Sequence, residues 1–93
     1  KECIYGFSRN GAATHYVDRY EYVDDRLTNV ARLSQVVKDG SEVEIVDERL
    51  IDGKWQVYHQ EIFYPLDPSA EEPWQDAYEQ SEILYVNDGY WDL

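Results

Sequence analysis

The segment from Asp67 to Glu82, DPSAEEPWQDAYEQSE, holds the densest group of side chains that could do chemistry. It contains six carboxylates, two large aromatic residues and no Lys or Arg. Clustered carboxylates can bind a divalent cation, transfer protons in catalysis, or present a negative field to a basic partner. Because like charges three or four residues apart repel on a helix, this composition has an energetic cost that calls for a use.

The spacing does not support a metal site or a catalytic site. Counted from Asp67, an EF-hand loop would place Glu72 where glycine is required, and Pro73 follows. His15 and His59 have no metal-ligand partner at the usual spacing, so we expect both to be sheet-surface or interior residues. The sequence contains no nucleophile elbow and no glycine-rich phosphate loop. We therefore expect a protein that is not an enzyme and has no metal or other cofactor.

The charge distribution favours binding to a basic protein. Twenty acids and eight bases give a net charge of −12, whereas a small soluble domain usually has a net charge of magnitude about 2–8. Residues 1–64 contain twelve acids and eight bases, and residues 65–93 contain eight acids and no base. A field of this sign repels nucleic acid and anionic membranes and attracts basic surfaces. Solubility alone would not require the asymmetry.

The first half of the chain is predicted to form a hairpin and a helix. Residues 3–7 and 14–23 have strand-like composition and are joined through a turn at Asn10-Gly11. Over residues 24–40, apolar side chains recur three and four residues apart, which indicates a helix. Asp24 or Asp25 would cap its N-terminus. A chain of ninety-three residues has room for a single domain, 1–93.

The second half is predicted to add a hairpin, a short helix and a strand. Residues 41–64 turn at Asp52-Gly53, and a bulge near Val46-Asp47 would reconcile their uneven alternation. The helix begins at Pro68 or at Pro73 and ends near Gln80, and residues 82–86 form a strand. The order is ββαββαβ, and residues 90–93 form a short terminal element after a turn at residues 87–89. This order indicates an α+β fold, with a small antiparallel sheet of four or five strands and two helices on one face.

The short helix would display the carboxylates as a ladder. Trp74, Ala77 and Tyr78 share one stripe toward the core, so the acids lie on the other side. Neighbouring Cβ atoms would be about 5–6 Å apart, which is of the same order as the spacing of phosphates along a nucleic-acid strand. Tyrosine and tryptophan are enriched among interface hot spots. The predicted partner-binding residues are Asp67, Glu71, Glu72, Asp76, Glu79, Glu82, Asp88, Tyr78 and Tyr85.

These residues predict an acidic inhibitor that mimics DNA or RNA and blocks the basic nucleic-acid-binding surface of a partner protein. The preferred version is a phage counter-defence protein of the anti-CRISPR or anti-restriction type. An immunity protein or antitoxin that neutralises a nuclease has the same physical basis and is an alternative. A non-inhibitory module that docks through the Tyr-rich strand containing Tyr16, Tyr20 and Tyr22 is another.

The expected location is the cytoplasm, which would be that of the host cell for a phage protein. No apolar run of 18 residues occurs, and the single cysteine, Cys3, suits a reducing compartment. We expect neither a membrane nor nucleic acid itself as a direct partner.

Overall fold

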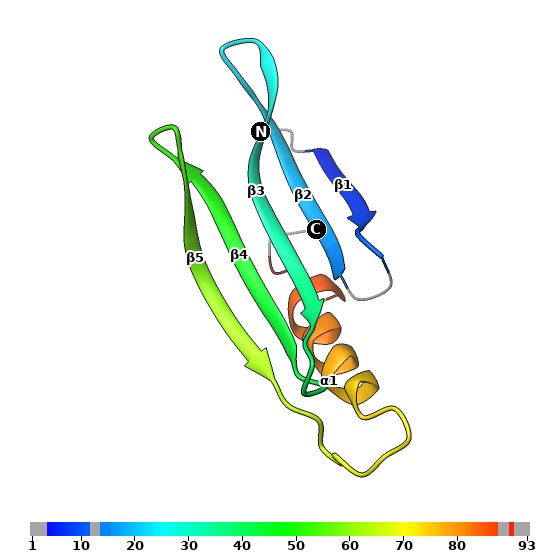
Figure 1. The fold of residues 1–93 in the computed structure, drawn as a ribbon. Coiled ribbons are helices and arrows are strands. Elements are labelled where there is room, and N and C mark those ends of the chain that lie inside the picture. Colours follow the sequence, from blue (N-terminus) through cyan, green and yellow to red (C-terminus); the bar gives the residue numbers. More distant parts are fainter. Residues whose placement is uncertain (1–3, 12–13, 88–89, 91–93) are drawn as a thin grey trace.

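Five strands form one antiparallel sheet whose spatial order follows the chain, β1-β2-β3-β4-β5 (Figure 1). The computed structural model describes residues 4–11, 14–87 and 90. The fold is α+β, as predicted, but five consecutive strands precede one α-helix instead of the order ββαββαβ with two helices. The elements are β1 (Ile4–Arg9), β2 (Thr14–Val23), β3 (Arg26–Val37), β4 (Val43–Ile51), β5 (Lys54–Phe63), α1 (Trp74–Ser81) and the π-helical η1 (Glu82–Asn87).

The predicted helix over residues 24–40 is wrong, because this segment forms a tight turn and strand β3. Asp24 and Asp25 have φ angles of 52° and 64°, the left-handed values that a two-residue type I′ hairpin turn requires. Neither residue therefore caps a helix. Ala31 and Leu33, two positions apart, are 4% and 2% exposed, which is the period of a strand. The spacing of three and four arises because apolar side chains occur on both faces of β3.

The predicted strand over residues 82–86 is also wrong, because these residues continue α1 as η1. Ala77, Ser81 and Tyr85 recur at intervals of four and are 0%, 0% and 6% exposed. One helical stripe thus buries all three side chains, whereas a strand would alternate between two faces. Of the two predicted helix starts, the later one forms, directly after Pro73.

Both predicted hairpins are confirmed. The β1–β2 connection passes through Asn10 and Gly11, and Gly11 has a φ angle of 74°. Between β4 and β5, Asp52 and Gly53 have φ angles of 52° and 77°, so this turn is again of type I′. The short terminal element predicted after residue 89 lies outside the described residues, apart from Tyr90.

The predicted bulge in the second hairpin lies one position further along than expected. The register of β4 and β5 shifts between Asp47 and Glu48, and Tyr58 of β5 is the extra residue. The bulge does not bring Val46 to the face that carries Ile45. Instead, β4 presents apolar side chains on both sides of the sheet.

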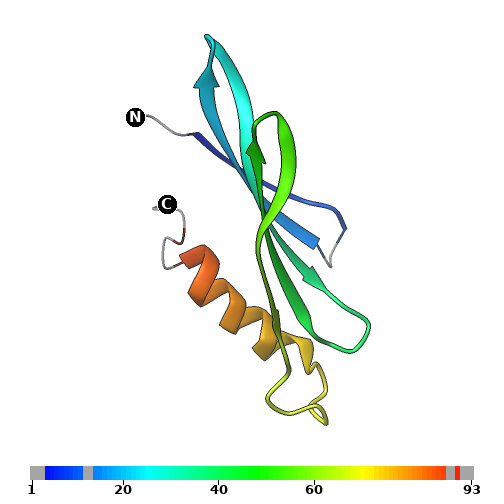
Figure 2. The same cartoon turned by 90° about the vertical axis from the view of Figure 1, so that its left-hand side faces the viewer.

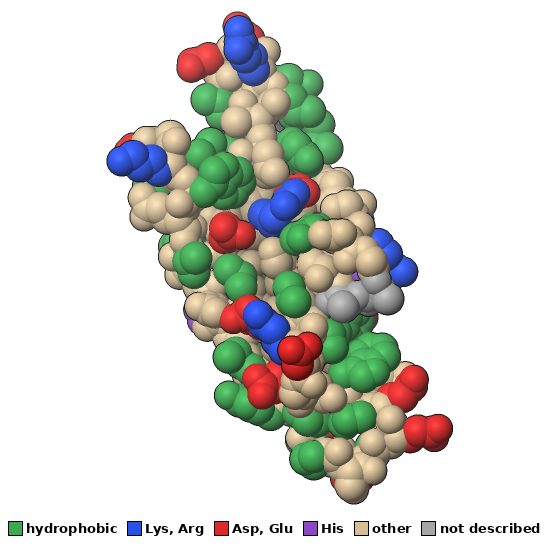
Figure 3. All heavy atoms as spheres, in the orientation of Figure 1, with side chains coloured by type: hydrophobic (Ala, Val, Ile, Leu, Met, Phe, Trp, Pro, Cys, Tyr) green, Lys and Arg blue, Asp and Glu red, His purple; other side chains and the backbone are tan. Residues whose placement is uncertain are grey.

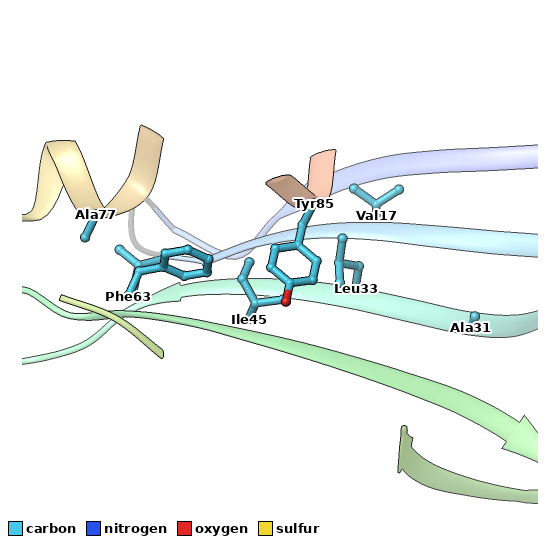
Figure 4. Close-up of a cluster of buried hydrophobic side chains, with 8 residues drawn as sticks. Val17, Ala31, Leu33, Ile45, Phe63, Ala77 and Tyr85 are labelled. Atoms are coloured by element: carbon cyan, nitrogen blue, oxygen red, sulfur yellow. The ribbon is translucent and has the colours of Figure 1, made fainter. Parts of the chain in front are cut away.

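α1 covers one face of the sheet, here called the helix face, and leaves the opposite, open face uncovered by any described element (Figure 2). Figure 4 shows Leu33, Ile45, Phe63 and Tyr85 directed toward one another between the sheet and the helical segment. Figure 3 shows that the open face mixes apolar and charged side chains. The buried core consists of Val17, Ala31, Leu33, Val43, Ile45, Phe63, Ala77 and Tyr85.

The far ends of the two hairpins extend beyond the region that α1 covers. β3 and β4 pair only from Val37 opposite Val43 to Ala31 opposite Arg49, and beyond that point the two hairpins diverge (Figure 1). The molecule is consequently elongated, measuring 51 × 22 × 22 Å. Neither helical element in the described part of the chain has the length and apolar character needed to cross a lipid bilayer.

Candidate functional site

The acidic segment, Asp67–Glu82, comprises part of the loop after β5, all of α1 and the first residue of η1. Two contacts with β3 fix its orientation. Gln35 Nε2 donates to Ser81 Oγ at 2.8 Å and to the backbone oxygen of Tyr78 at 3.3 Å. Since Ala77 and Ser81 are fully buried against the sheet, the opposite side of α1, with Gln75 and Glu79, is exposed to solvent.

The two predicted aromatic anchors turn toward the sheet and away from solvent. Tyr85 is 6% exposed, and its hydroxyl donates to Glu61 and lies 2.9 Å from His59 Nε2. Tyr78 is half-buried, and its hydroxyl hydrogen-bonds with His15 Nδ1. Burial, and then the charge of Glu82, raises the pKa of the Tyr78 hydroxyl. These rings therefore hold the segment on the sheet and are not displayed on its surface.

Some carboxylates of the acidic segment shape the loop before α1. Asp76 Oδ2 accepts a hydrogen bond of 2.8 Å from the backbone N–H of Leu66, which ties the loop to the first turn of the helix. Asp67 Oδ1 accepts from Ser69 Oγ at 2.6 Å and from Ser69 N–H at 3.0 Å. These bonds to Ser69 stabilise the carboxylate and lower the pKa of Asp67. Glu72 accepts from Gln75 Nε2 at 2.6 Å.

The other carboxylates of the segment differ in accessibility. Glu71 and Glu79 are exposed, whereas Glu82 is half-buried. Carboxylates project beside the loop that leads into α1, at the lower right of Figure 3. Asp88, the remaining predicted contact residue, lies outside the described residues. The predicted set is thus brought together along one helix and its leading loop, but only part of it faces solvent freely.

Ion pairs distinguish the sheet from the acidic segment. Asp18 is paired with Arg32 at 2.7 Å, and Asp47 is paired with Arg49 at 3.0 Å. Glu44 is likewise 3.2 Å from the ammonium of Lys38. All ion pairs among the described residues lie between Asp18 and Glu61, so none involves a carboxylate of the acidic segment.

Exposed apolar side chains lie at both ends of the acidic segment, and the sequence reasoning missed them. Leu66 in the preceding loop is 78% exposed, and Tyr64 is 62% exposed. At the other end, Ile83 and Leu84 of η1 are 55% and 52% exposed. The exposure of residues 83 and 84 could have been predicted from the spacing of Ala77, Ser81 and Tyr85. On a helix, that spacing places residues 83 and 84 on a different side from the buried stripe.

A hollow of about 340 Å³ lies between α1 and the β1–β2 hairpin, and its lining includes Arg9, His15, Tyr78 and Glu82. His15 is engaged with the Tyr78 hydroxyl, and no serine or cysteine nucleophile is bonded to it among the described residues. The same residues contain no group of three or more His, Cys, Asp or Glu side chains placed to hold a metal ion. The predicted strand positions of both histidines are confirmed, and each contacts a tyrosine hydroxyl.

No protein family, no curated protein and no solved structure matches this chain.

Proposed function

We propose that this protein is an acidic inhibitor that binds, through its acidic segment, the basic nucleic-acid-binding surface of another protein. The observation that carries the proposal is the absence of basic partners for the carboxylates of this segment among the described residues. The carboxylates of the sheet, by contrast, include several that are neutralised within the fold. Unpaired negative charge accelerates encounter with a basic surface and discriminates among partners.

The apolar residues that flank the segment supply contact area that charge alone lacks. Leu66 on one side and Ile83 and Leu84 on the other would be covered when a partner closes over α1. Burial of their apolar surface would add binding free energy in proportion to the area removed from water. In this proposal they replace Tyr78 and Tyr85, which the fold uses internally.

A phage counter-defence protein of the anti-CRISPR or anti-restriction type and an immunity protein for a nuclease share this physical basis. Both occupy a cleft that normally receives phosphates, and the identity of the captured partner distinguishes them. The interaction-module alternative has less support, because only Tyr22 of its three tyrosines is exposed. Tyr16 and Tyr20 are half-buried, and the guanidinium of Arg32 lies 4.3 Å from the Tyr16 ring centre.

A pair of charge-reversal variants tests the proposal. In the first, Glu71, Glu72 and Glu79 are replaced by Lys. In the matched control, Asp39→Lys, Glu42→Lys and Glu48→Lys change the net charge by the same amount outside the acidic segment. Each protein is immobilised and used to capture partners from the native host or from its infecting strain, and bound proteins are identified by mass spectrometry.

We expect wild type and control to retain a basic nucleic-acid-binding protein that the first variant does not retain. DNA or RNA should compete for the captured protein, and its affinity should fall steeply as salt is raised, mainly through a slower association rate. Equal capture by all three proteins, or simultaneous binding of nucleic acid and inhibitor, would contradict the proposal.

A further inference from the structure

Strand β5 forms one edge of the sheet, and its outer side has no partner strand among the described residues. It pairs with β4 alone, and in Figure 2, which faces this edge, no other element crosses it. The strand has ten residues, contains no proline and carries a lysine only at its first position. Proteins usually protect such edges with prolines, lysines, bulges or shortness, because exposed backbone groups recruit another strand, and of these β5 has one lysine and one bulge.

The side chains of β5 add to this exposure. Trp55 is 46% exposed, Val57 59%, Tyr58 60% and Ile62 40%. The opposite edge, β1, has only six residues. β5 is therefore the longer edge of the sheet and carries more exposed apolar side chains.

The register shows which backbone groups of β5 point away from β4. Ile51 and Lys54 flank the two-residue turn, where the flanking residues of such a hairpin exchange both hydrogen bonds. Because the antiparallel ladder alternates, Trp55 and Val57 direct their N–H and C=O groups outward. The extra residue at Tyr58 shifts the alternation by one position.

Beyond the bulge, the outward-directed residues are consequently Gln60 and Ile62. In β4, Val46 lies opposite Gln60 and Glu44 lies opposite Ile62. Before the bulge, Glu48 lies opposite Val57 and Leu50 lies opposite Trp55. Since cross-strand partners share a face, all four outward-directed residues of β5 have their side chains on the open face.

We propose that two copies of this chain pair antiparallel through β5, about a two-fold axis between Tyr58 and His59. Trp55 then lies opposite Ile62 of the second copy, and Val57 lies opposite Gln60 of the second copy. In this register, each residue whose N–H and C=O point outward lies opposite another such residue of the second copy. The backbone donors and acceptors of the two edges therefore match. A shift by one residue would set outward-directed against inward-directed backbone groups and would put facing side chains on opposite faces.

The side chains fit the same register. On the open face, Trp55 and Ile62 of the second copy form an apolar cross-strand pair of the kind that stabilises sheets. On the helix face, Lys54 lies diagonally across from Glu61 of the second copy, within reach of a long side chain. β5 carries one base and one acid, so it has no net charge in a protein whose net charge is −12. The side chains of this edge therefore add no net repulsion of their own between two copies.

Salt dependence separates this dimer from the proposed capture of a basic partner. The two copies repel one another through their remaining carboxylates, and salt screens that repulsion. Dimerisation should therefore strengthen as salt rises, whereas binding of a basic partner should weaken. Either result can occur without the other, because β5 and the acidic segment do not overlap.

Sedimentation equilibrium on the purified chain, from low salt to about 1 M NaCl, tests the proposal. We expect the mass to rise from 11.0 kDa toward twice that value with salt and concentration. Val57→Pro removes an outward-directed N–H that the monomer does not use, so this variant should remain a folded monomer at every salt concentration. The control Val57→Thr keeps the N–H and should dimerise like wild type.

Amide exchange in the wild-type protein provides a readout that does not depend on the folding of a variant. The amides of Trp55, Val57, Gln60 and Ile62 should exchange rapidly in the monomer and become protected in the dimer. The amide of Gln56, which points toward β4, should be protected in both states. A monomer at all salts and concentrations, or a dimer in which the four amides stay unprotected, would overturn the proposal.

Discussion

The sheet and the acidic segment use the same kind of side chain in opposite ways. Asp18 and Asp47 of the sheet are 5% and 0% exposed, and an arginine neutralises each of them. In the acidic segment, Glu71 and Glu79 are exposed and, within the described residues, no base is paired with them. Asp18 and Asp47 therefore maintain the fold, whereas Glu71 and Glu79 are open to solvent.

The two regions also differ in how their polar groups are connected. Asp47 accepts bonds from Arg49 and from the hydroxyl of Tyr90, and the Arg49 guanidinium lies 3.7 Å from the Tyr58 ring centre. In the acidic segment, the hydrogen bonds of Asp67, Glu72 and Asp76 reach only groups within ten residues in the sequence. Net charge alone therefore does not identify a binding surface, because it does not distinguish paired from unpaired carboxylates.

The largest expected effect on stability is that of Asp47→Ala. The substitution removes a fully buried carboxylate and leaves the guanidinium of Arg49 and the hydroxyl of Tyr90 without their acceptor. We expect the free energy of unfolding in urea to fall by about 3 kcal/mol, at the lower end of the cost of breaking a buried pair, since Arg49 is partly exposed. A loss no larger than that of Glu79→Ala would remove the contrast between the regions.

The link between the regions can be broken at Gln35. Gln35→Ala removes the donor to Ser81 Oγ and to the Tyr78 backbone oxygen. A cost of about 1–3 kcal/mol is expected, because buried acceptors lose a partner. Denaturant unfolding gives the magnitude, and amide exchange should show that the loss is concentrated in α1. Uniform loosening of the sheet would indicate that Gln35 does not position the acidic segment.

An alkaline titration tests the buried tyrosine hydroxyls that pack against the sheet. Burial, and then its bond to Asp47, raises the pKa of Tyr90 to about 12, and burial also raises the pKa of Tyr85. An unfolded tyrosine ionises near pH 10. The stabilisation from these groups is therefore complete below about pH 10 and is lost as pH rises toward about 12. Tyr90→Phe should make the decline of unfolding free energy over this range shallower, and an unchanged slope would contradict this assignment.

The smallest expected effect is that of neutralising the acidic segment. Glu71→Gln with Glu79→Gln removes two exposed charges that make no ion pair in the described structure. Their loss should change the unfolding free energy by no more than about 0.5 kcal/mol, with any change toward greater stability as repulsion is relieved. Thermal unfolding at low and high salt measures this. A clear loss of stability would mean that these acids serve the fold after all.

The turns and the inner stripe of α1 could be predicted from the sequence, because short-range rules determine them. Asp52-Gly53 supplies the positive φ angles that a two-residue hairpin needs. Ala77 and Tyr78 face the sheet at the predicted helical spacing. The asymmetry of charge is a property of composition, and it is visible without coordinates.

The region 24–40 could not be assigned from the sequence, because its apolar spacing fits a helix as well as a strand that is apolar on both faces. Pairing with neighbouring strands decides between the helix and the strand. From Ala31 to Val37, β3 lies between β2 and β4, and these two strands satisfy its backbone groups on both sides. The Asp24-Asp25 turn carried the signal for a hairpin, but acidic residues before an apolar stripe are equally typical of a helix N-terminus.

The acidity of this protein, the concentration of its negative charge after residue 64 and the positions of several turns follow from the amino-acid sequence alone. Which carboxylates are neutralised, which tyrosines are buried and which strand edge lacks a partner within the described residues became clear from the folded chain. The physical reason is that composition and turn geometry are local, whereas ion pairing, burial and strand order depend on residues brought together from distant parts of the chain.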